Sequence, residues 1–517
     1  MRLPAVEKIK NILWALFLVT LPVTSFPFFP SQLGGDFIVR PLSLFPLAGL
    51  LLLVTLPALF HKPLPRPLPR TFQTLMPFLL VAASSSVLSL LSGINPTFAV
   101  SVVERLTRGL ITLGIGAATY LTVAIIPKTF DELKNSLRWL YAGFSAALLW
   151  GTAQAIYVIR FSPEYFQLID KLQSFISTRR LFENRVSGMT YEPNWFGAQL
   201  SFVLIPWLIA SVLSDFTVFT WRWKKVTIEW LLLAWSLVIL TFTFSRAGLA
   251  ILLMVLFFSV FVLRLIPARS YSNARSPTRR PKLPLNWLRR LTEASAAIAL
   301  VAALICLAGQ NNAFFKRLWD FWDNSQTVNL DRYFKYLGFG ARFTFGSAAF
   351  NVFDAHPILG VGLGNYAFYF EEAMPVVSIV DVPEVLRLVT QNVERYRLMT
   401  PKNFYLRILA ETGIAGLATF LPFLLALFGS ALYLYLSSHR HEQFWGTAGL
   451  CLLVAFSMSA LSFDSFAIPN MWVVFGLLSA ATWAADHNRA QAAPAGAWEE
   501  SQVESKPAPL KNKNEAI

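Results

Sequence analysis

Apolar runs long enough to cross a membrane recur along almost the whole chain. A helix needs about 20 apolar residues to cross the hydrocarbon core of a bilayer, and about twelve runs of that length lie between residues 11 and 485. Only 14% of the 517 residues are charged, whereas a soluble domain carries about 25%. The chain is therefore predicted to be an all-α polytopic membrane protein with about 12 transmembrane helices.

The predicted spans form two blocks around one long polar stretch. The first block lies within residues 1–309, with spans near 11–30, 38–60, 72–92, 106–126, 137–158, 194–214, 226–244, 247–266 and 293–309. A large polar loop occupies 310–402, and the second block lies within 403–485, with spans near 404–436, 444–463 and 467–485. Residues 486–517 are rich in Ala, Pro, Lys and Glu, which predicts a disordered tail.

Basic residues between the spans predict which side of the membrane each connector faces. If both termini are cytoplasmic, the connectors 61–71, 127–138, 215–226, 267–292 and 437–443 also lie in the cytoplasm, as the positive-inside rule requires. The outer face then carries 93–105, 159–193, the loop 310–402 and the turn at Ser245–Arg246. The net charge of +15 does not predict nucleic-acid binding, because the basic residues are scattered between helices.

Sequence patterns of metal, nucleotide and redox sites are absent. No CxxC, HExxH, Walker or G-x-G-x-x-G pattern occurs, and Cys306 and Cys451 both lie in apolar runs. Glycines 360, 362 and 364 follow no predicted strand, so they predict either a tight turn or a backbone cradle for sugar or phosphate. We therefore expect neither a metal nor a cofactor.

Arginines at the predicted outer border of the membrane are candidates for binding an anion. Arg246 lies in FTFSRAGLAI between two apolar runs, where an arginine costs free energy unless it is paired, hydrated or in reach of headgroups. Arg342 precedes a predicted amphipathic helix at the membrane edge of the polar loop, and Arg105 and Arg185 are weaker candidates. A guanidinium presents a planar fork of donors that matches phosphate oxygens. Snorkelling to the surface or simple solvation is the alternative for each.

Polar residues also mark the start of the predicted span at 404–436. In PKNFYLRILAETGIAG, Asn403 and Glu411 are separated by about two helical turns and fall on roughly the same face. Lys402 precedes this helix, either as a plain interfacial lysine or as a partly desolvated base. In YEPNWFG, Asn194 follows a proline that is typical of a helix start.

At these residues the chain resembles the O-antigen ligase and O-antigen polymerase superfamily of bacterial membrane glycosyltransferases. The similar segments are SRAG (245–248), DAHPILGVGLGNY (354–366), KNFYLRILAETGIAG (402–416) and, more loosely, SGMTYEPNWFG (187–197). The resemblance implies a GT-C-like fold in the bacterial inner membrane and a role in assembling surface polysaccharide or lipopolysaccharide. It also implies metal-independent transfer of a glycan from a polyprenyl diphosphate on the outer leaflet to a glycan or lipid acceptor.

The resemblance assigns roles to individual residues. Arginines hold the diphosphate and stabilise the leaving group, which suits Arg246 and Arg342. Further substrate-binding candidates are Arg105, Arg185, Asn194, Gly362, Gly364, Asn365, Asn403 and Tyr405. Family members commonly read His-Asn where this chain has Lys402-Asn403, which favours a polymerase-like or divergent member over a lipid A–core ligase. Either Lys402, His356, Glu371, Glu372 or Glu411 is then the base that activates the acceptor, or the reaction differs.

Two other classes of function stay open at this stage. A transporter of a small anion such as bicarbonate would show repeat symmetry and broken helices that meet at the bilayer midplane, and the sequence has no convincing internal repeat. A non-catalytic assembly or scaffold protein would not need arginines at a membrane edge.

Overall fold

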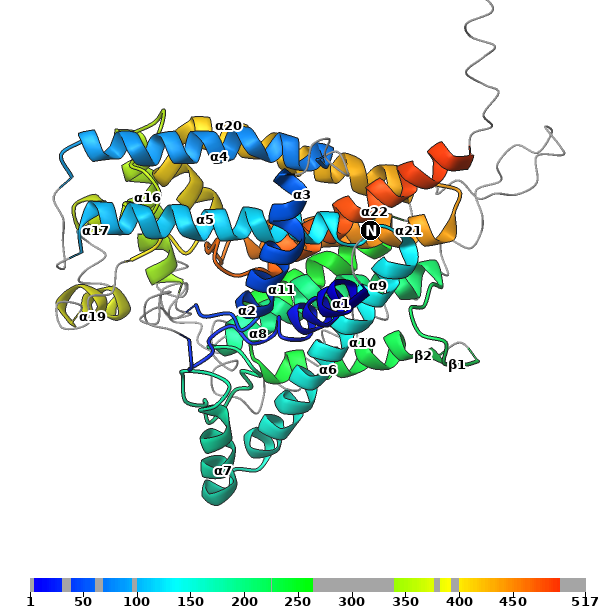
Figure 1. Ribbon diagram of the computed structural model, residues 1–517. Helices are drawn as coiled ribbons and strands as arrows, with labels where there is room; N and C mark the ends of the chain where they lie inside the picture. Colours follow the sequence, from blue (N-terminus) through cyan, green and yellow to red (C-terminus); the bar gives the residue numbers. More distant parts are fainter. Residues whose placement is uncertain are drawn as a thin grey trace, which may run out of the picture.

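The computed structural model describes residues 4–29, 39–60, 68–94, 100–224, 226–263, 339–375, 382–391 and 399–492. These residues fold mostly into helices, many of which run lengthwise in one bundle (Figure 1). Within them the only sheet is a hairpin of β1 (Arg222–Trp223) and β2 (Val226–Thr227). The predicted all-α class is confirmed. The predicted span at 293–309, the connector 267–292 and residues 310–338 of the polar loop lie outside the described residues.

Five of the described helices are long and apolar enough to cross a membrane. Each covers a predicted span, because the length of an apolar run sets both the position and the extent of a spanning helix. The predicted total of about twelve spans stays a prediction. The five are α4 (Arg70–Leu88) with its 3-10 extension Ser89–Leu91, α5 (Val102–Ile125), α6 (Phe130–Ile159), the run of α8 (Pro193–Gln199), a π turn (Leu200–Leu204) and α9 (Ile205–Ser214), and α20 (Phe404–Tyr435).

Four further helices cover the predicted spans near 226–244, 247–266, 444–463 and 467–485. They are the shorter apolar helices α10 (Ile228–Phe242) and α11 (Arg246–Phe257), the latter with a π turn over Phe258–Val262, and the longer helices α21 (Arg440–Ser459) and α22 (Asn470–Ala492). Outside the main bundle, α7 (Pro163–Gln173) follows α6 and forms a projecting helical hairpin with it (Figure 1).

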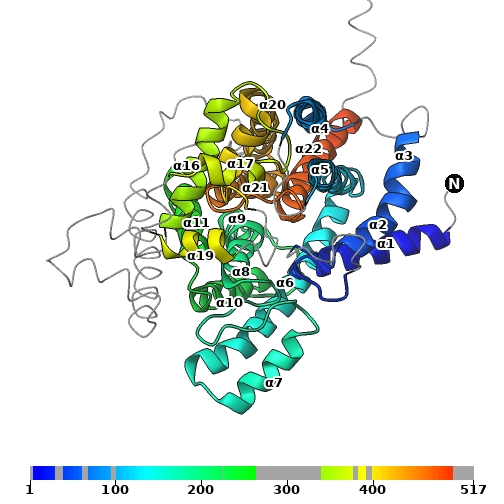
Figure 2. The same ribbon diagram turned by 90° about the vertical axis from the view of Figure 1, so that its left-hand side faces the viewer.

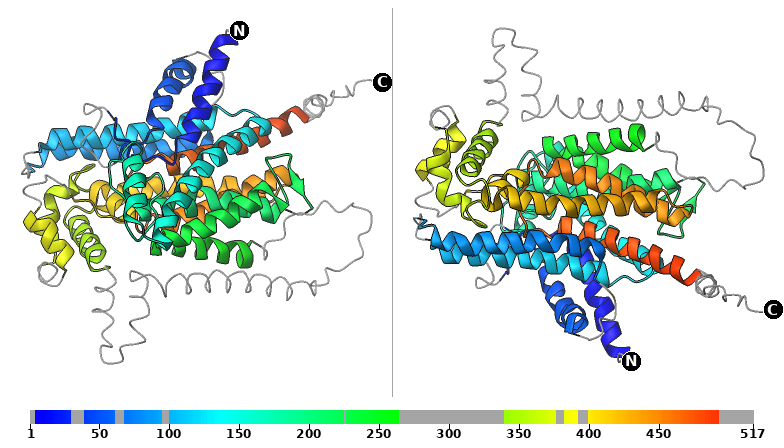
Figure 3. Two further views of the ribbon diagram at one scale, coloured as in Figure 1. Left: turned by 90° about the horizontal axis from the view of Figure 1, so that it is seen from below. Right: turned by 90° about the horizontal axis from the view of Figure 1, so that it is seen from above.

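The two predicted spans nearest the N-terminus differ from the observed helices. α1 (Pro4–Val19) ends well before residue 30, because the following PVTSFPFFP segment is too rich in proline to continue a helix. The segment 39–43 pairs with 23–26 instead of being helical, so the next helix begins only at Leu44. It runs through α2 (Leu44–Leu50), a π turn (Leu51–Thr55) and α3 (Leu56–Phe60), and α1 and α2 project from one side of the bundle (Figure 3).

The prediction of a disordered tail from Asp486 is wrong for residues 486–492, which continue α22. The Tyr433 hydroxyl donates a hydrogen bond to Asp486 at 2.6 Å, and the Arg489 guanidinium lies 4.4 Å from the ring centroid of Tyr433. Arg489 also forms a salt bridge with Glu442. These contacts with α20 and α21 hold the last turns of α22 in place.

The described part of the predicted polar loop is largely helical. α16 (Gly340–Ala355), α17 (Tyr366–Ala373) and α19 (Pro383–Gln391) lie within it, so the segment is a small helical cap and not an extended loop. Figure 2 shows these helices across one end of the bundle. Arg342 lies inside α16, where the sequence placed it before a helix.

The predicted cytoplasmic connectors meet one another at the opposite end of the bundle. Asp215 forms salt bridges with Arg222 at 2.5 Å and with Arg440 at 3.3 Å. The rings of Phe130 and His441 lie 4.5 Å apart. These contacts join the connectors 127–138, 215–226 and 437–443, which the charge pattern assigned to one side. In Figure 1 the hairpin and the end of α22 lie far from α16, α17 and α19.

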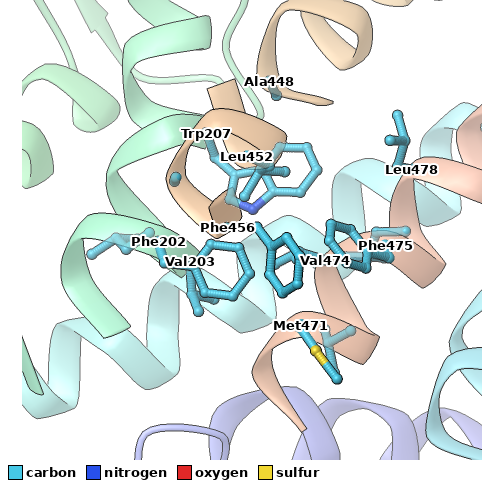
Figure 4. Packing of buried hydrophobic residues seen from close by; sticks show 14 of the residues in the cluster. Phe202, Val203, Trp207, Ala448, Leu452, Phe456, Met471, Val474, Phe475 and Leu478 are labelled. Atoms are coloured by element: carbon cyan, nitrogen blue, oxygen red, sulfur yellow. The ribbon is translucent and has the colours of Figure 1, made fainter. Parts of the chain in front are cut away.

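The hydrophobic core fixes the relative positions of the helices between these two ends. α21 packs against α9, α11, α20 and α22. Trp207 of α9 is fully buried, and its ring lies 5.0 Å from that of Trp445 in α21. Figure 4 shows Phe202 and Val203 facing Phe456 of α21, with Val474 and Phe475 of α22 beyond it. A rigid core of this kind lets polar residues at the helix ends keep fixed distances.

Candidate functional site

Helix α20 is broken at Gly413, and another segment completes its hydrogen bonds. Gly413 has φ 65° and ψ −166°, which is not helical. Before the break, the carbonyls of residues 410–411 accept hydrogen bonds from the amides of 361–362. After it, the amides of 414–415 donate to the carbonyls of 357–358, and all four distances lie between 2.8 and 3.2 Å. Because a helix break leaves backbone groups without partners, this pairing holds the segment HPILGVG against α20.

The glycines of the longer segment HPILGVGLG allow its close approach to the neighbouring helices. Gly360, Gly362 and Gly364 all have positive φ, a conformation that glycine adopts without strain. A Cβ on Gly360 would lie 2.5 Å from the backbone of Glu411. One on Gly364 would lie 3.1 Å from the Arg105 side chain. Tight packing therefore accounts for the glycine pattern of the predicted turn.

Serines of α4 and the side chain of Asn365 complete this packing. The Ser85 hydroxyl donates to the Leu359 and Glu411 carbonyls at 2.5 and 3.0 Å. The fully buried Asn365 amide donates to the Ser89 hydroxyl at 3.0 Å and to a backbone carbonyl at 2.9 Å. Asn365 was predicted to bind substrate, and the structure places it inside the protein.

A first charged group lies at the start of α20 and contains two residues that the sequence reasoning missed. The Arg407 guanidinium donates to Glu411 at 2.9 Å and to the Asp464 carbonyl at 2.5 Å. Only 2% of the Glu411 side chain is exposed, so this predicted base is enclosed in an ion pair. The i, i+4 spacing from Arg407 to Glu411 could have revealed the pair. Asp464 is a lone acid in SFDSF, between two apolar runs.

Lys402 is held in an unusual backbone conformation next to this group. Its φ is 53°, and its amide donates to the Asp464 carboxylate at 2.7 Å. Its side-chain nitrogen lies 3.7 Å from a carboxylate oxygen of Glu384 and 4.3 Å from the ring centroid of Phe345. Lys402 thus joins the start of α20 to α16 and α19.

A second charged group surrounds the turn between α10 and α11. Arg185 is only 9% exposed, and its guanidinium donates to the Thr243 carbonyl at 2.9 Å, the Asn194 side chain at 2.8 Å and the Phe244 carbonyl at 3.3 Å. Arg246 begins α11 directly after this turn, where the Ser245 hydroxyl caps the helix by accepting from the Gly248 amide at 3.1 Å. The structure therefore brings together three predicted site residues: Arg185, Asn194 and Arg246.

Burial and nearby charges both change the pKa of the Arg185 guanidinium. The pKa of the Arg185 guanidinium is lowered to about 10, mainly by burial; Glu192 raises it, and the charges of Arg246 and Arg179 lower it. Because this value lies well above 7, Arg185 is positively charged at neutral pH. The charges of Arg246 and Arg179 therefore repel that of Arg185, which is partly desolvated. A bound anion would reduce this repulsion.

Arg342 lies between the two charged groups. Burial lowers the pKa of its guanidinium, whereas the carboxylates of Glu384, Glu192 and Asp464 raise it. Glu192 belongs to the second group and Asp464 to the first, so Arg342 is within electrostatic reach of both. Arg105 of α5 belongs to the first group, because its guanidinium donates to the Gly364 carbonyl at 2.8 Å and lies within electrostatic reach of Asp464. The four predicted arginines therefore gather at one end of the bundle.

The other predicted residues are placed around this cluster with varied exposure. The Asn403 side chain caps α20 by accepting from the amides of residues 405 and 406 at 3.0 and 3.1 Å. The Tyr405 hydroxyl donates to the Ser457 carbonyl at 3.2 Å. His356 ends α16, and its ring lies 5.4 Å from that of Tyr369. The carboxylates of Glu371 and Glu372 are on exposed positions of α17.

Comparison with known proteins places a family domain over this region. Residues 231–421 match the family model described as O-antigen ligase (Wzy_C). The match includes Arg246, Arg342, the segment 354–366 and Lys402, whereas Arg105, Arg185, Asn194 and Asp464 lie outside it. No curated protein matches the chain.

Proposed function

We propose that the protein is a glycosyltransferase acting on a polyprenyl-diphosphate-linked glycan, on the premise that residues 231–421 match the family model described as O-antigen ligase. The resemblance described above implies an inner-membrane enzyme that processes lipid-linked glycans, and five described helices are long and apolar enough to cross a membrane. In the proposed reaction the glycan moves from its carrier to a glycan or lipid acceptor on the outer face of the inner membrane. Such a reaction is a step in the assembly of surface polysaccharide or lipopolysaccharide.

The gathering of Arg105, Arg185, Arg246 and Arg342 is the observation that carries this proposal. They come from four separate segments. Asp464 acts electrostatically on Arg105 and Arg342, Glu192 acts on Arg185 and Arg342, and Arg246 acts on Arg185. Folding brings together like charges from distant parts of a sequence at a cost, which a polyanionic ligand offsets. A lipid diphosphate supplies such an anion, and guanidinium groups bind its oxygens in a bidentate manner.

The proposed chemistry uses these arginines to stabilise the departing diphosphate. The acceptor oxygen attacks the anomeric carbon, the bond from that carbon to the diphosphate oxygen breaks, and polyprenyl diphosphate leaves with the electron pair. Arg246 and Arg342 neutralise the charge that develops on this leaving group. No metal is part of this proposal.

The proton of the acceptor hydroxyl goes to Lys402 in our assignment. Lys402 occupies the position where the resemblance implies an acceptor-activating residue, and Asp464 fixes its backbone. To accept a proton, Lys402 must first release its ammonium proton to solvent and, as the neutral amine, leave the ion pair with Glu384. Glu411 is less suited to this role because Arg407 encloses its carboxylate.

Small-anion transport, the second candidate, gains no support from the broken helix. Transporters use helix breaks to bind ions with the freed backbone groups. In α20 the backbone of residues 357–362 forms hydrogen bonds with the freed groups instead.

The experiment follows release of polyprenyl diphosphate from a lipid-linked glycan by the purified full-length protein. We expect Arg246→Ala and Arg342→Ala each to lower turnover by about 10²-fold or more. The matched control is Arg222→Ala, which removes an arginine from the opposite end of the bundle. Equal turnover of wild type and Arg246→Ala would refute the diphosphate assignment.

A further inference from the structure

Three aromatic rings and a guanidinium lie in a row beside the second charged group. The Arg179 guanidinium carbon lies 4.5 Å from the ring centroid of Phe182 and 5.0 Å from that of Tyr191. The ring of Tyr191 in turn lies 5.7 Å from that of Trp195. Arg179 also forms a salt bridge with Glu192. We call these five residues the aromatic stack.

The aromatic stack is held rigidly although it is not part of the core. Its three rings are partly exposed, and the side chains of Arg179 and Glu192 are 36% and 34% exposed. A β-bridge between Phe182 and Arg185 fixes one end, and the Trp195 amide donates to the Glu192 carbonyl at 3.0 Å at the other. Exposed rings that are fixed in this way offer a preformed surface for a ligand.

The aromatic stack adjoins the arginines assigned to the diphosphate. Asn194, which lies between Tyr191 and Trp195 in the chain, accepts a hydrogen bond from Arg185 at 2.8 Å. Glu192 acts electrostatically on both Arg185 and Arg342. In a polyprenyl-diphosphate-linked glycan the first sugar is bonded directly to the diphosphate. A sugar attached to a diphosphate in this cluster therefore lies within a short distance of the stack.

The composition of the aromatic stack suits a sugar better than a lipid chain. One face of a pyranose ring is lined with C–H groups that pack on aromatic rings, while its hydroxyls need hydrogen-bond partners at the edges. Arg179 offers donors in a planar fork and Glu192 offers acceptors. The Tyr191 hydroxyl and the Trp195 ring nitrogen belong to partly exposed side chains, so both can bond a hydroxyl of the ligand. An acyl chain would use the rings and leave the charged pair without a role.

We propose that the aromatic stack is a glycan-binding platform that holds the sugar nearest the diphosphate, with Tyr191 and Trp195 beneath the ring and Arg179 and Glu192 at its hydroxyls. This inference rests on the proposed function, because it places the diphosphate at the adjacent arginines. The platform selects the sugar, and the arginines bind the part of the donor that all lipid-linked glycans share.

The test measures binding of two kinds of probe to the full-length protein in nanodiscs. One is bare polyprenyl diphosphate, and the other is the same carrier bearing one sugar, taken in turn as a hexose, a deoxyhexose and an N-acetylhexosamine. We expect wild type to bind at least one sugar-bearing carrier more tightly than the bare carrier. Trp195→Ala should weaken binding of that probe by about tenfold and leave the bare carrier unchanged. Trp195→Phe, which keeps a ring, should recover part of the loss.

Two controls separate failure of this inference from failure of the proposed function. Trp221→Ala removes a partly exposed tryptophan next to the hairpin and should change neither binding constant. Arg246→Ala should weaken both probes. If Arg246→Ala weakens both and Trp195→Ala weakens neither, the platform is wrong and the diphosphate site stands. If Arg246→Ala changes neither, the proposed function fails first. Equal wild-type affinity for bare and all sugar-bearing carriers would also overturn the platform.

Discussion

The two ends of the helix bundle hold their positive charges in different ways. At the hairpin end, Arg222 and Arg440 share the exposed carboxylate of Asp215. At the other end, Arg105 and Arg185 donate to backbone carbonyl and amide oxygens, which orient a guanidinium but carry no full charge. Exposed ion pairs need no further charged partner, because water and salt screen their charges. The carboxylates of Glu411 and Glu192 act on Arg105 and Arg185 from nearby, beside the charges of neighbouring arginines. Partly buried guanidinium groups that neutral oxygens orient are less screened by water than the exposed pairs, which suits the anion proposed above.

This comparison predicts that removing a buried charge partner is far more damaging than removing an exposed one. Arg407→Ala leaves the Glu411 carboxylate buried, since only 2% of that side chain is exposed. We expect the free energy of unfolding to fall by about 3–5 kcal/mol, measured by denaturant or thermal unfolding in detergent. The double variant Arg407→Leu with Glu411→Gln removes both charges and should recover much of that loss. A stable Arg407→Ala single variant would mean that water reaches Glu411.

The largest expected effect on activity comes from the arginines that touch the proposed leaving group. Arg246→Ala should lower turnover by about 10²–10³-fold, with little change in unfolding temperature. Arg246→Lys keeps the charge but loses the planar fork, so its turnover should lie between those of wild type and alanine. An Arg246→Lys variant with full turnover would show that only charge matters at this position.

Lys402 allows proton transfer to be separated from charge. Lys402→Ala should lower turnover by about 10²-fold while binding the donor with similar affinity. Lys402→Arg keeps a cation beside Glu384 but cannot accept a proton at accessible pH, so we expect it to be as slow as alanine. If Lys402→Arg is active, the residue serves as a cation and another group is the base.

The sequence predicted those features that depend on residues close together along the chain. Spans such as 102–125 follow from apolar length alone, and Arg246 stands out because its context is apolar. Asp464 was missed because its partner Lys402 lies far away in the sequence and the interaction uses a backbone amide. The break at Gly413 was missed for a similar reason. GIAG fits a straight, closely packed helix, and only the pairing with residues 357–362 makes the break stable.

The smallest effect is expected from a variant at the hairpin end of the bundle. Asp215→Asn removes the carboxylate that Arg222 and Arg440 share, and its side chain is 50% exposed. Exposed pairs contribute about 0–1 kcal/mol, so the free energy of unfolding should fall by less than about 1 kcal/mol and turnover should be unchanged. Raising the salt concentration should shrink even this difference, because ions screen surface pairs. A loss comparable to that of Arg407→Ala would mean that the hairpin end depends on its charges as much as the arginine cluster does, and the contrast between the two ends would no longer hold.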